Sequence, residues 1–186
     1  RNLLITFHPV TLSADAGLSE LRALLDALSR LPPDVALWIS RPNADPGNHA
    51  VNAALDAWAE GRDQVRLRAG FGQTGYLSLM AAADAVVGNS SSGLYEAPSL
   101  GAPTVDIGDR QAGRLAASSV IRVGAEADAI EAAVLRAMAM DASGTVNPYG
   151  DGRASGRIVA VLKAALQGEG RVEALLRKRF HEGGHD

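Results

Sequence analysis

A turn dense in glycine and serine, VVGNSSSGLYEAP at residues 86–98, carries the residue types with the clearest chemical potential in this chain. Main-chain N–H groups that are free at the start of a helix bind anions, and serine hydroxyls add further donors. One serine would suffice to cap a helix. Three serines between two glycines predict that Ser90, Ser91 and Ser92 bind a phosphate group.

Glu96 comes four residues after the last of these serines, in helix-like sequence. A carboxylate in the first turn of a helix interacts favourably with the helix dipole. A carboxylate that faces a ligand can instead accept hydrogen bonds from a vicinal diol, as acidic residues do with ribose. The sequence leaves both roles for Glu96 open.

Polar or glycine-rich segments also follow the other strand-like stretches. His8 stands in TFHPV, Asn43 in RPNADPG, Phe71 in GFGQTGY and Arg110 in GDRQAGR. An arginine offers planar, charge-assisted hydrogen bonds to phosphate, although Arg110 could also form a salt bridge with Asp109. A lone histidine is more often structural, but one at a strand end can donate to a phosphate or carry a proton.

The elements that must position these residues alternate between short aliphatic strands and amphipathic helices. The predicted strands are Leu3–Phe7, Val35–Ser40, Val65–Ala69, Ala85–Gly88, Thr104–Ile107 and Val120–Val123. Leucines at helical spacing predict a helix over residues 18–31. Further helices are predicted over Asn48–Gly61, Tyr76–Ala83, Gly93–Leu100, Asp128–Met140, Ala154–Leu166 and Val172–Phe180.

This alternation predicts an α/β fold, a Rossmann-like parallel sheet with helices on both faces, formed by one domain. The carboxyl ends of parallel strands meet at one edge of the sheet, where ligands bind. We therefore expect the polar segments to lie together at that edge. The turn has neither a GxGxxG pattern nor a Walker lysine, so neither of those nucleotide-binding modes is predicted.

Composition restricts the class of protein. The net charge of −3 provides no basic field for nucleic acid, and the absence of cysteine excludes disulfides and thiolate metal sites. No apolar run is long enough to span a membrane, and no signal peptide precedes the first strand. We expect a cytoplasmic protein that binds neither nucleic acid nor membrane.

The strings TFHPVT, PNAD, GNSSSGLYEAPSLGAPTVDIGDRQAGR and NPYGDGRAS together resemble the UDP-N-acetylglucosamine 2-epimerases, specifically the hydrolysing branch of bacterial sialic-acid-type pathways. The resemblance covers the C-terminal half of such an enzyme. It implies that residues 1–186 are the UDP-binding, C-terminal domain of a two-domain glycosyltransferase-B architecture, ending in a helix and tail at residues 171–186. It also implies a partner N-terminal domain that this chain lacks.

The resemblance carries over roles for the residues around the serine turn. Ser90 and Ser91 match serines that hold the diphosphate, and Ser92 has a supporting role. Arg110 matches a phosphate-binding arginine. His8 matches the histidine that reaches the sugar–phosphate junction, and is the expected catalytic residue of this chain.

Three further residues match positions that contact the nucleoside part of UDP. Glu96 matches a ribose-binding glutamate, and Asn43 matches a nucleotide-contacting asparagine. The main chain of Phe71 stands where the backbone pairs with the uracil edge.

The family chemistry is elimination of UDP across C1–C2 of UDP-N-acetylglucosamine, followed by addition of water to the glycal to give N-acetylmannosamine. The resemblance implies UDP and UDP-N-acetylhexosamine as ligands, a homo-oligomer at full length, no metal and no cofactor. Because the carboxylates near C2 and C3 come largely from the N-terminal domain, we expect little turnover by this chain alone. The alternatives are the same reaction on UDP-N,N'-diacetylbacillosamine, a UDP-sugar glycosyltransferase, and a non-catalytic binding module.

Overall fold

The computed structural model describes residues 1–167 and 171–177. The end of the helix predicted over Val172–Phe180, and the tail beyond it, lie outside the described residues. Contacts within the chain divide it into two units, residues 1–149 and residues 150–186. The first unit contains the whole sheet.

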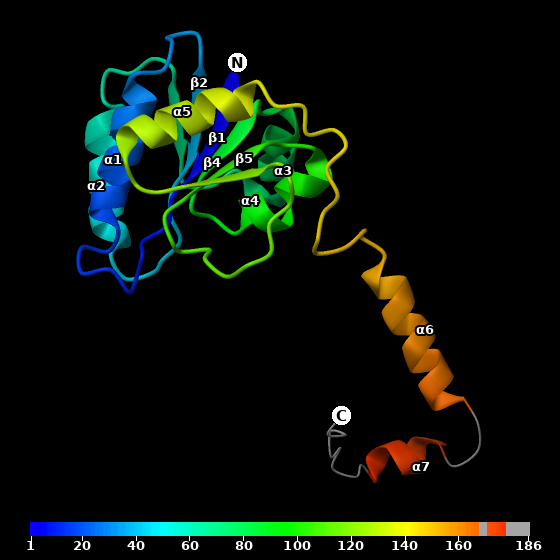
Figure 1. Ribbon diagram of the computed structural model, residues 1–186. Coiled ribbons are helices and arrows are strands. Elements are labelled where there is room, and N and C mark those ends of the chain that lie inside the picture. The colour runs from blue at the N-terminus through cyan, green and yellow to red at the C-terminus, as the bar shows by residue number, and fades with distance from the viewer. Residues whose placement is uncertain (168–170, 178–186) are drawn as a thin grey trace. The chain divides into compact units, whose positions relative to one another are not determined.

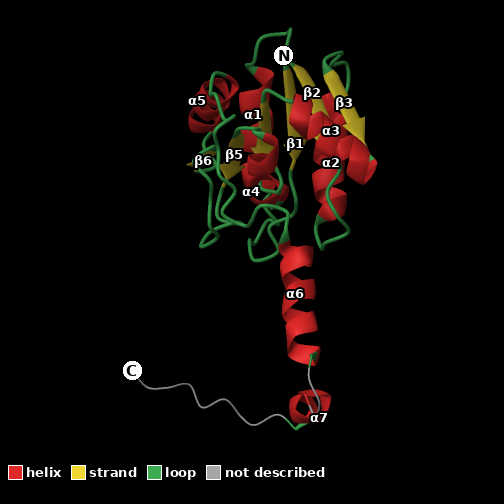
Figure 2. Ribbon diagram, turned by 90° about the vertical axis from the view of Figure 1, so that its right-hand side faces the viewer, coloured by secondary structure: helices red, strands yellow, loops and turns green. Residues whose placement is uncertain are grey.

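The sheet has six parallel strands in the order β3-β2-β1-β4-β5-β6. Its central strands β2, β1, β4 and β5 are labelled in Figure 1. Helices cover it on both sides (Figure 2). This arrangement confirms the predicted Rossmann-like fold, and each predicted strand is present to within one residue at either end. The strands are β1 (Asn2–Thr6), β2 (Ala36–Ser40), β3 (Val65–Arg68), β4 (Ala85–Gly88), β5 (Thr104–Ile107) and β6 (Val120–Val123).

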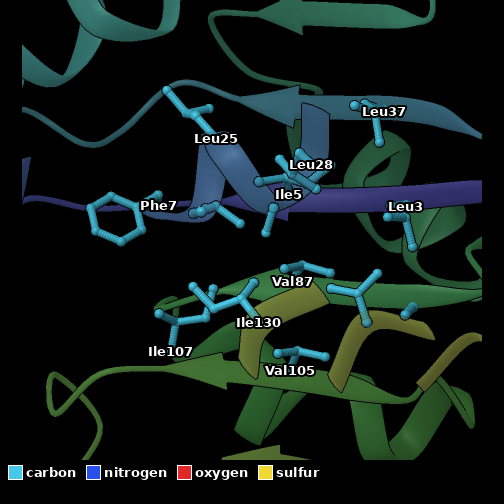
Figure 3. Packing of buried hydrophobic residues seen from close by; sticks show 14 of the residues in the cluster. Leu3, Ile5, Phe7, Leu25, Leu28, Leu37, Val87, Val105, Ile107 and Ile130 are labelled. Atoms are coloured by element: carbon cyan, nitrogen blue, oxygen red, sulfur yellow. The ribbon is translucent and has the colours of Figure 1, made fainter. Parts of the chain in front are cut away.

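One face of the sheet, here called the aliphatic face, is built from large apolar side chains. The register places Ile5 beside Val87, and Val87 beside Val105. Leucine, isoleucine and valine side chains from the covering helices pack onto this row, and Figure 3 shows the resulting cluster. The covering helices are α1 (Leu18–Ser29), α2 (Asn48–Ala59) and α5 (Ala127–Met138).

The opposite face, here called the polar face, carries strand residues of the other parity. Leu4 lies beside Val86 and Val86 beside Thr104, while the row that begins at Thr6 continues to Asp106. Its apolar cluster is small, with Leu4, Val86, Met80, Ala97 and Ala102 as the buried members. The covering elements are α3 (Gly72–Ala82), α4 (Ser92–Tyr95) and the 3₁₀ helix η1 (Ala97–Leu100).

The helix predicted over Gly93–Leu100 is wrong as a single element. The structure divides it into the four-residue α4 and η1, with Glu96 between them. Pro98 explains the division, because proline has no N–H to donate and disfavours the α conformation at the residue before it. The α3 helix also begins earlier than predicted, at Gly72.

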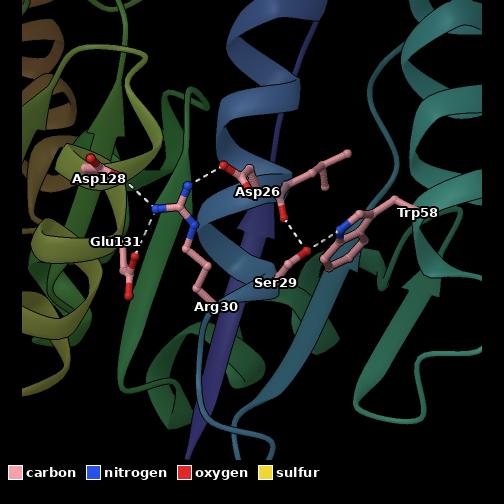
Figure 4. A network of polar contacts seen from close by, with 7 residues as sticks. Asp26, Ser29, Arg30, Trp58, Asp128 and Glu131 are labelled. Atoms are coloured by element: carbon pink, nitrogen blue, oxygen red, sulfur yellow. Dashed lines mark hydrogen bonds and ion pairs between the residues drawn. The ribbon is translucent and has the colours of Figure 1, made fainter.

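Polar contacts tie the helices on the aliphatic face to one another (Figure 4). The Arg30 guanidinium, just beyond the end of α1, forms ion pairs with Asp26 of α1 and with Asp128 and Glu131 of α5. The indole N–H of Trp58 in α2 donates to the Ser29 hydroxyl of α1 at 2.9 Å. These contacts link α2, α1 and α5 across the outside of the layer.

The second unit contains α6 (Ala154–Leu166) and α7 (Arg171–Leu176). Neither helix buries a residue. Asp151 accepts a hydrogen bond from the main-chain N–H of Arg153 and pairs with Arg157, which stabilises the first turn of α6. Among the described helices, none has the length and apolar character that crossing a membrane requires.

Candidate functional site

The strand order reverses direction between β1 and β4, which makes the carboxyl ends of these two strands the expected ligand position in an open parallel sheet. Gly88 ends β4 there with a φ of +138°. A Cβ atom at Gly88 would lie 2.0 Å from the main-chain oxygen of Thr6. Only glycine therefore lets the two strands approach this closely beside the site.

Asn89 is the residue that joins the ends of three strands. Its side-chain oxygen accepts from the main-chain N–H of His8 at 2.7 Å, and its side-chain NH₂ donates to the His8 carbonyl at 2.9 Å. Its own carbonyl accepts from Arg110 at 3.2 Å and from Gln111 at 2.8 Å. Because Asn89 is completely buried, these contacts fix the segments after β1, β4 and β5 relative to one another.

The imidazole of His8 lies at this junction in its neutral form. Its Nδ1 accepts a hydrogen bond from the main-chain N–H of Asn43 at 3.2 Å, so the proton of a neutral ring is on Nε2. Burial, and then the positive charge of Arg110, lower the pKa of His8 below its ordinary value. His8 is thus a neutral donor whose Nε2–H can reach a ligand oxygen.

The loop after β2 meets the loop after β5 above His8. The Asn43 side chain donates to Asp45 at 2.8 Å, and Asp45 lies 3.9 Å from the Arg110 guanidinium. Arg110 therefore pairs with Asp45 and not with Asp109, the partner that the sequence suggested. Burial lowers the pKa of Arg110, and the distant Asp45 compensates its charge only in part. An anion bound here would complete that compensation.

The serine turn places hydroxyls and free N–H groups beside Asn89. Ser92 donates its hydroxyl to Ser90 at 3.0 Å and also contacts the Tyr76 hydroxyl at 2.8 Å, which in turn contacts Thr6 at 3.0 Å. Within the described residues, no hydrogen bond uses the main-chain N–H of Ser90 or Ser91. Two unpaired donors thus stand at the turn, while Ser92 serves to orient Ser90.

Glu96 occupies the C-terminal end of α4. Glu96 is also the N-cap residue of η1, an end of a helix at which a negative charge is favourable, so the dipole explanation for this carboxylate stays open. Burial raises the pKa of Glu96. In the part of the chain that the structure describes, the Glu96 carboxylate forms no hydrogen bond or ion pair with another residue.

Phe71 precedes α3, and its side chain belongs to the core of the polar face. The ring packs edge-on against Trp38 with the ring centres 6.4 Å apart. The side chain is partly buried in this packing, and the role of the Phe71 main chain toward a ligand stays a prediction. No hydrogen bond of the described residues connects either Phe71 or Glu96 to the His8–Asn89–Arg110 group.

Asp106 is a buried carboxylate on the polar face that sequence reasoning did not single out. It is 3 % exposed, one of its oxygens has no partner, and Arg122 lies 3.6 Å from the other. Burial raises the pKa of Asp106 to about 6. With Gly108, Asp109 and Arg122 it lines a hollow of about 360 Å³ at the ends of β5 and β6.

Asn89, Asp45 and Tyr76 were also missed, although each has some signal in the sequence. Asn89 lies directly between the end of β4 and the serines, and Asp45 lies two residues after Asn43. Tyr76 stands four residues into α3, and its ring belongs to the core whereas its hydroxyl reaches Ser92. Their roles depend on contacts between distant segments, which spacing alone does not reveal.

In open parallel α/β sheets, ligands such as nucleotides bind at the carboxyl ends of the strands, which is where the arginine, the neutral histidine and the unpaired N–H groups lie here. Residues 1–163 match the family model described as UDP-N-acetylglucosamine 2-epimerase. The chain belongs to this family.

Two curated relatives show where the sequence similarity lies. The chain is 38 % identical over 119 residues to the GDP/UDP-N,N'-diacetylbacillosamine 2-epimerase (hydrolyzing) of Campylobacter jejuni, covering 63 % of this chain and 31 % of the relative. It is 34 % identical over 130 residues to polysialic acid biosynthesis protein P7 of Escherichia coli, covering 70 % and 33 %. The chain thus spans about a third of the length of these relatives.

Two solved structures share the fold. A UDP-N-acetylglucosamine 2-epimerase homologue from Listeria monocytogenes superposes with a TM-score of 0.72 at 20 % identity, over 88 % of this chain and 45 % of that one. The UDP-GlcNAc 2-epimerase of Neisseria meningitidis, bound to UDP-GlcNAc, gives a TM-score of 0.64 at 24 % identity, over 88 % and 44 %. The superposed part of this chain thus corresponds to slightly less than half of each of these two chains.

Proposed function

We propose that this chain is the UDP-binding part of a hydrolysing UDP-N-acetylhexosamine 2-epimerase. The observation that carries the proposal is the set of contacts around Asn89, which holds His8 and Arg110 beside the serine turn. Membership of the epimerase family supports UDP-N-acetylglucosamine as the substrate. The relationship to a polysialic acid biosynthesis protein supports a role in making sialic-acid-type sugars.

In this proposal the diphosphate occupies the space between Arg110 and the free N–H groups of Ser90 and Ser91. These donors are held in place before the reaction, so they stabilise the charge that develops on UDP as the C1–O bond breaks. The Nε2–H of His8 donates to an oxygen at the sugar–phosphate junction. Glu96 accepts hydrogen bonds from the ribose hydroxyls, while Asn43 and the main chain of Phe71 contact the nucleoside.

Elimination across C1–C2 also requires acid–base groups near C2 and C3 of the sugar. We assign none of these to the present chain. They are supplied, in this proposal, by an N-terminal domain of the same enzyme, in a glycosyltransferase-B arrangement. The proposed enzyme is homo-oligomeric and cytoplasmic. The chain alone then binds UDP but catalyses little turnover.

Calorimetric titration with UDP tests the binding part of the proposal. Wild-type chain should bind, and Arg110→Ala should weaken binding by about 10- to 100-fold, because it removes a charge-assisted contact worth roughly 1.5–3 kcal/mol. The matched control is Arg136→Ala, an exposed arginine in the last turn of α5 on the aliphatic face. Equal UDP affinity of wild type and Arg110→Ala, or no binding by either at millimolar UDP, would overturn the proposal.

A second candidate substrate is UDP-N,N'-diacetylbacillosamine, which the name of the C. jejuni relative favours. Product analysis of this chain joined to an N-terminal domain, with each sugar nucleotide in turn, distinguishes the two. Release of the free 2-epimeric sugar and UDP without an acceptor identifies a hydrolysing epimerase. A requirement for an acceptor would indicate a glycosyltransferase instead.

A further inference from the structure

Four hydroxyl groups form a continuous chain through the polar face, from the end of β1 to the serine turn. The Thr6 hydroxyl oxygen lies 3.0 Å from that of Tyr76 in α3, and the Tyr76 oxygen lies 2.8 Å from that of Ser92 in α4. The Ser92 hydroxyl donates to the Ser90 hydroxyl at 3.0 Å. Tyr76 is therefore the member of the chain that connects β1 to the turn.

The direction of the protons along this chain follows from one of its bonds. Each hydroxyl has a single proton, and the proton of Ser92 is used in the bond to Ser90. The contact between Tyr76 and Ser92 therefore needs the proton of Tyr76. Because that proton is used in turn, Thr6 is the donor in its contact with Tyr76. The protons thus all point the same way, from Thr6 toward Ser90.

Ser90 is the end of the chain that faces no further protein group. Its oxygen accepts from the Ser92 hydroxyl and also from the main-chain N–H of Ser92, at 3.3 Å. A hydroxyl oxygen has two lone pairs, so these two bonds use its capacity to accept. Within the residues that the structure describes, the Ser90 hydroxyl donates to no acceptor. Its proton is left for a ligand atom that accepts hydrogen bonds, such as a phosphate oxygen.

The surroundings of the first two members limit competition from water. Thr6 is 5 % exposed, and the ring of Tyr76 packs against the buried apolar cluster of the polar face. Where the effective dielectric constant is low, hydrogen bonds in series polarise one another. The hydroxyls behind Ser90 should therefore strengthen it as a donor as well as fix its direction.

We propose that Tyr76 is a positioning residue for the phosphate position: by donating to Ser92, its hydroxyl keeps Ser90 as a donor toward the ligand. The inference rests on the proposed function, in which the diphosphate lies beside Ser90. Without the Tyr76 hydroxyl, the bond between the two serines can reverse. Ser90 then donates to Ser92, and the phosphate loses that donor although both serines are still present.

Phosphorus NMR titrations with UDP and with pyrophosphate test the role of Tyr76. Tyr76→Phe removes only the hydroxyl and should weaken binding of both ligands about three- to tenfold, because an oriented donor is lost. Tyr149→Phe is the matched control, since it removes an exposed tyrosine hydroxyl that donates to the main chain of Leu115. The control should bind both ligands like the wild type. Wild-type affinity in Tyr76→Phe would overturn the inference.

A double-mutant cycle with Ser90→Ala separates a positioning role from a merely structural one. If Tyr76 acts through Ser90, adding Tyr76→Phe to Ser90→Ala should change the affinity by less than about 1.5-fold. A general loosening of the polar face would lower the affinity in both backgrounds, and that result would contradict the inference. Ser92→Ala breaks the chain one hydroxyl later and should weaken binding at least as much as Tyr76→Phe. Unchanged affinity in Ser92→Ala would also overturn the inference.

The two ligands separate failure of this inference from failure of the proposed function. UDP binding that is equal in wild type and Tyr76→Phe overturns the inference only. Pyrophosphate binding that depends on Tyr76 through Ser90, without any binding of UDP, supports the inference and overturns the proposed function. If the wild-type chain binds neither ligand at millimolar concentration, both are overturned.

Discussion

The two faces of the sheet are built from different chemistry. Every buried strand residue on the aliphatic face is apolar, and three full-length helices cover that face. The polar face buries Thr6, Thr104 and Asp106 among its strand residues, and it is covered by one ordinary helix and two four-residue elements. The register of parallel strands produces this division, because neighbouring residues in register point to the same side.

This difference indicates that the two faces have separate roles. A continuous aliphatic layer gives most of the apolar burial that stabilises the fold. The polar face has shorter covering elements, and within the described residues its turn leaves the main-chain N–H groups of Ser90 and Ser91 without a hydrogen-bond acceptor. The chain can thus keep unpaired donors at the site because the opposite side of the same strands supplies the stability.

The largest expected effect is on the aliphatic face. Leu24→Ala removes a fully buried side chain of α1 and leaves a cavity, so the free energy of unfolding should fall by about 3 kcal/mol. Urea unfolding measures this, and UDP affinity of the folded chain should not change. Leu135→Ala, on an exposed position, should shift stability by less than about 0.5 kcal/mol. Loss of UDP affinity in Leu24→Ala would show that the faces are not independent.

Asn89→Ala should affect stability and binding together, because this residue lies where the polar face meets the site. Loss of two buried hydrogen bonds to His8 should cost about 1–3 kcal/mol. UDP affinity should fall as well, since His8 and the serine turn lose their common anchor. Thr104→Val removes a buried hydrogen bond to Gly93 and serves as the control, with lower stability but unchanged UDP affinity. If Asn89→Ala and Thr104→Val bound UDP with the same affinity, that result would argue against a positioning role for Asn89.

Asp106→Asn should stabilise the protein at pH 7. The folded state raises the pKa of this carboxyl from 3.8 to about 6, so the folded chain binds the proton more tightly than the unfolded chain. Protonation of the Asp106 carboxyl therefore stabilises the folded state at low pH, and this stabilisation is lost as the pH rises from 3.8 to about 6. Removing the charge should raise the free energy of unfolding by about 1–2 kcal/mol at pH 7. Unfolding curves from pH 4 to 7 should converge for the two proteins at the acid end.

The smallest effect concerns His8. Because its folded pKa lies below the ordinary 6.5, the stability associated with the neutral ring is lost as pH falls from that value through the folded pKa. NMR titration of the imidazole should show a midpoint below 6.5. Arg110→Ala should raise the midpoint by removing a nearby positive charge, and bound UDP should raise it by adding negative charge. A midpoint that responds to neither change would place His8 outside the phosphate position.

The fold could be predicted closely from the sequence because its strands are short aliphatic runs bounded by turn residues. Thr104–Ile107 even shows the division into two faces, since Thr104 and Asp106 alternate with Val105 and Ile107. The broken helix around Glu96 was not predicted, although Pro98 marks it. Periodicity of apolar residues outweighed the effect of a single proline in that reading.

The site was predictable only at the level of strand ends. Parallel topology brings His8, Asn43, Ser90 and Arg110 to one edge. Hydrogen bonds connect Asn43 to His8, and both His8 and Arg110 to Asn89, the residue that precedes Ser90. Arg110 pairs with Asp45 and not with Asp109 because of the conformations of the two loops, which no local sequence pattern specifies. The roles of these residues toward UDP stay predictions.

The close approach of β1 and β4 at Gly88 has a consequence for any substitution of this glycine by a larger residue. A single added methyl group there would collide with main-chain atoms, which cannot rotate away as a side chain can. It would push β1 and β4 apart, and so separate strands β3, β2 and β1 from strands β4, β5 and β6. The distance between His8, which follows β1, and the serine turn, which follows β4, would then widen, although each of these residues would still be intact.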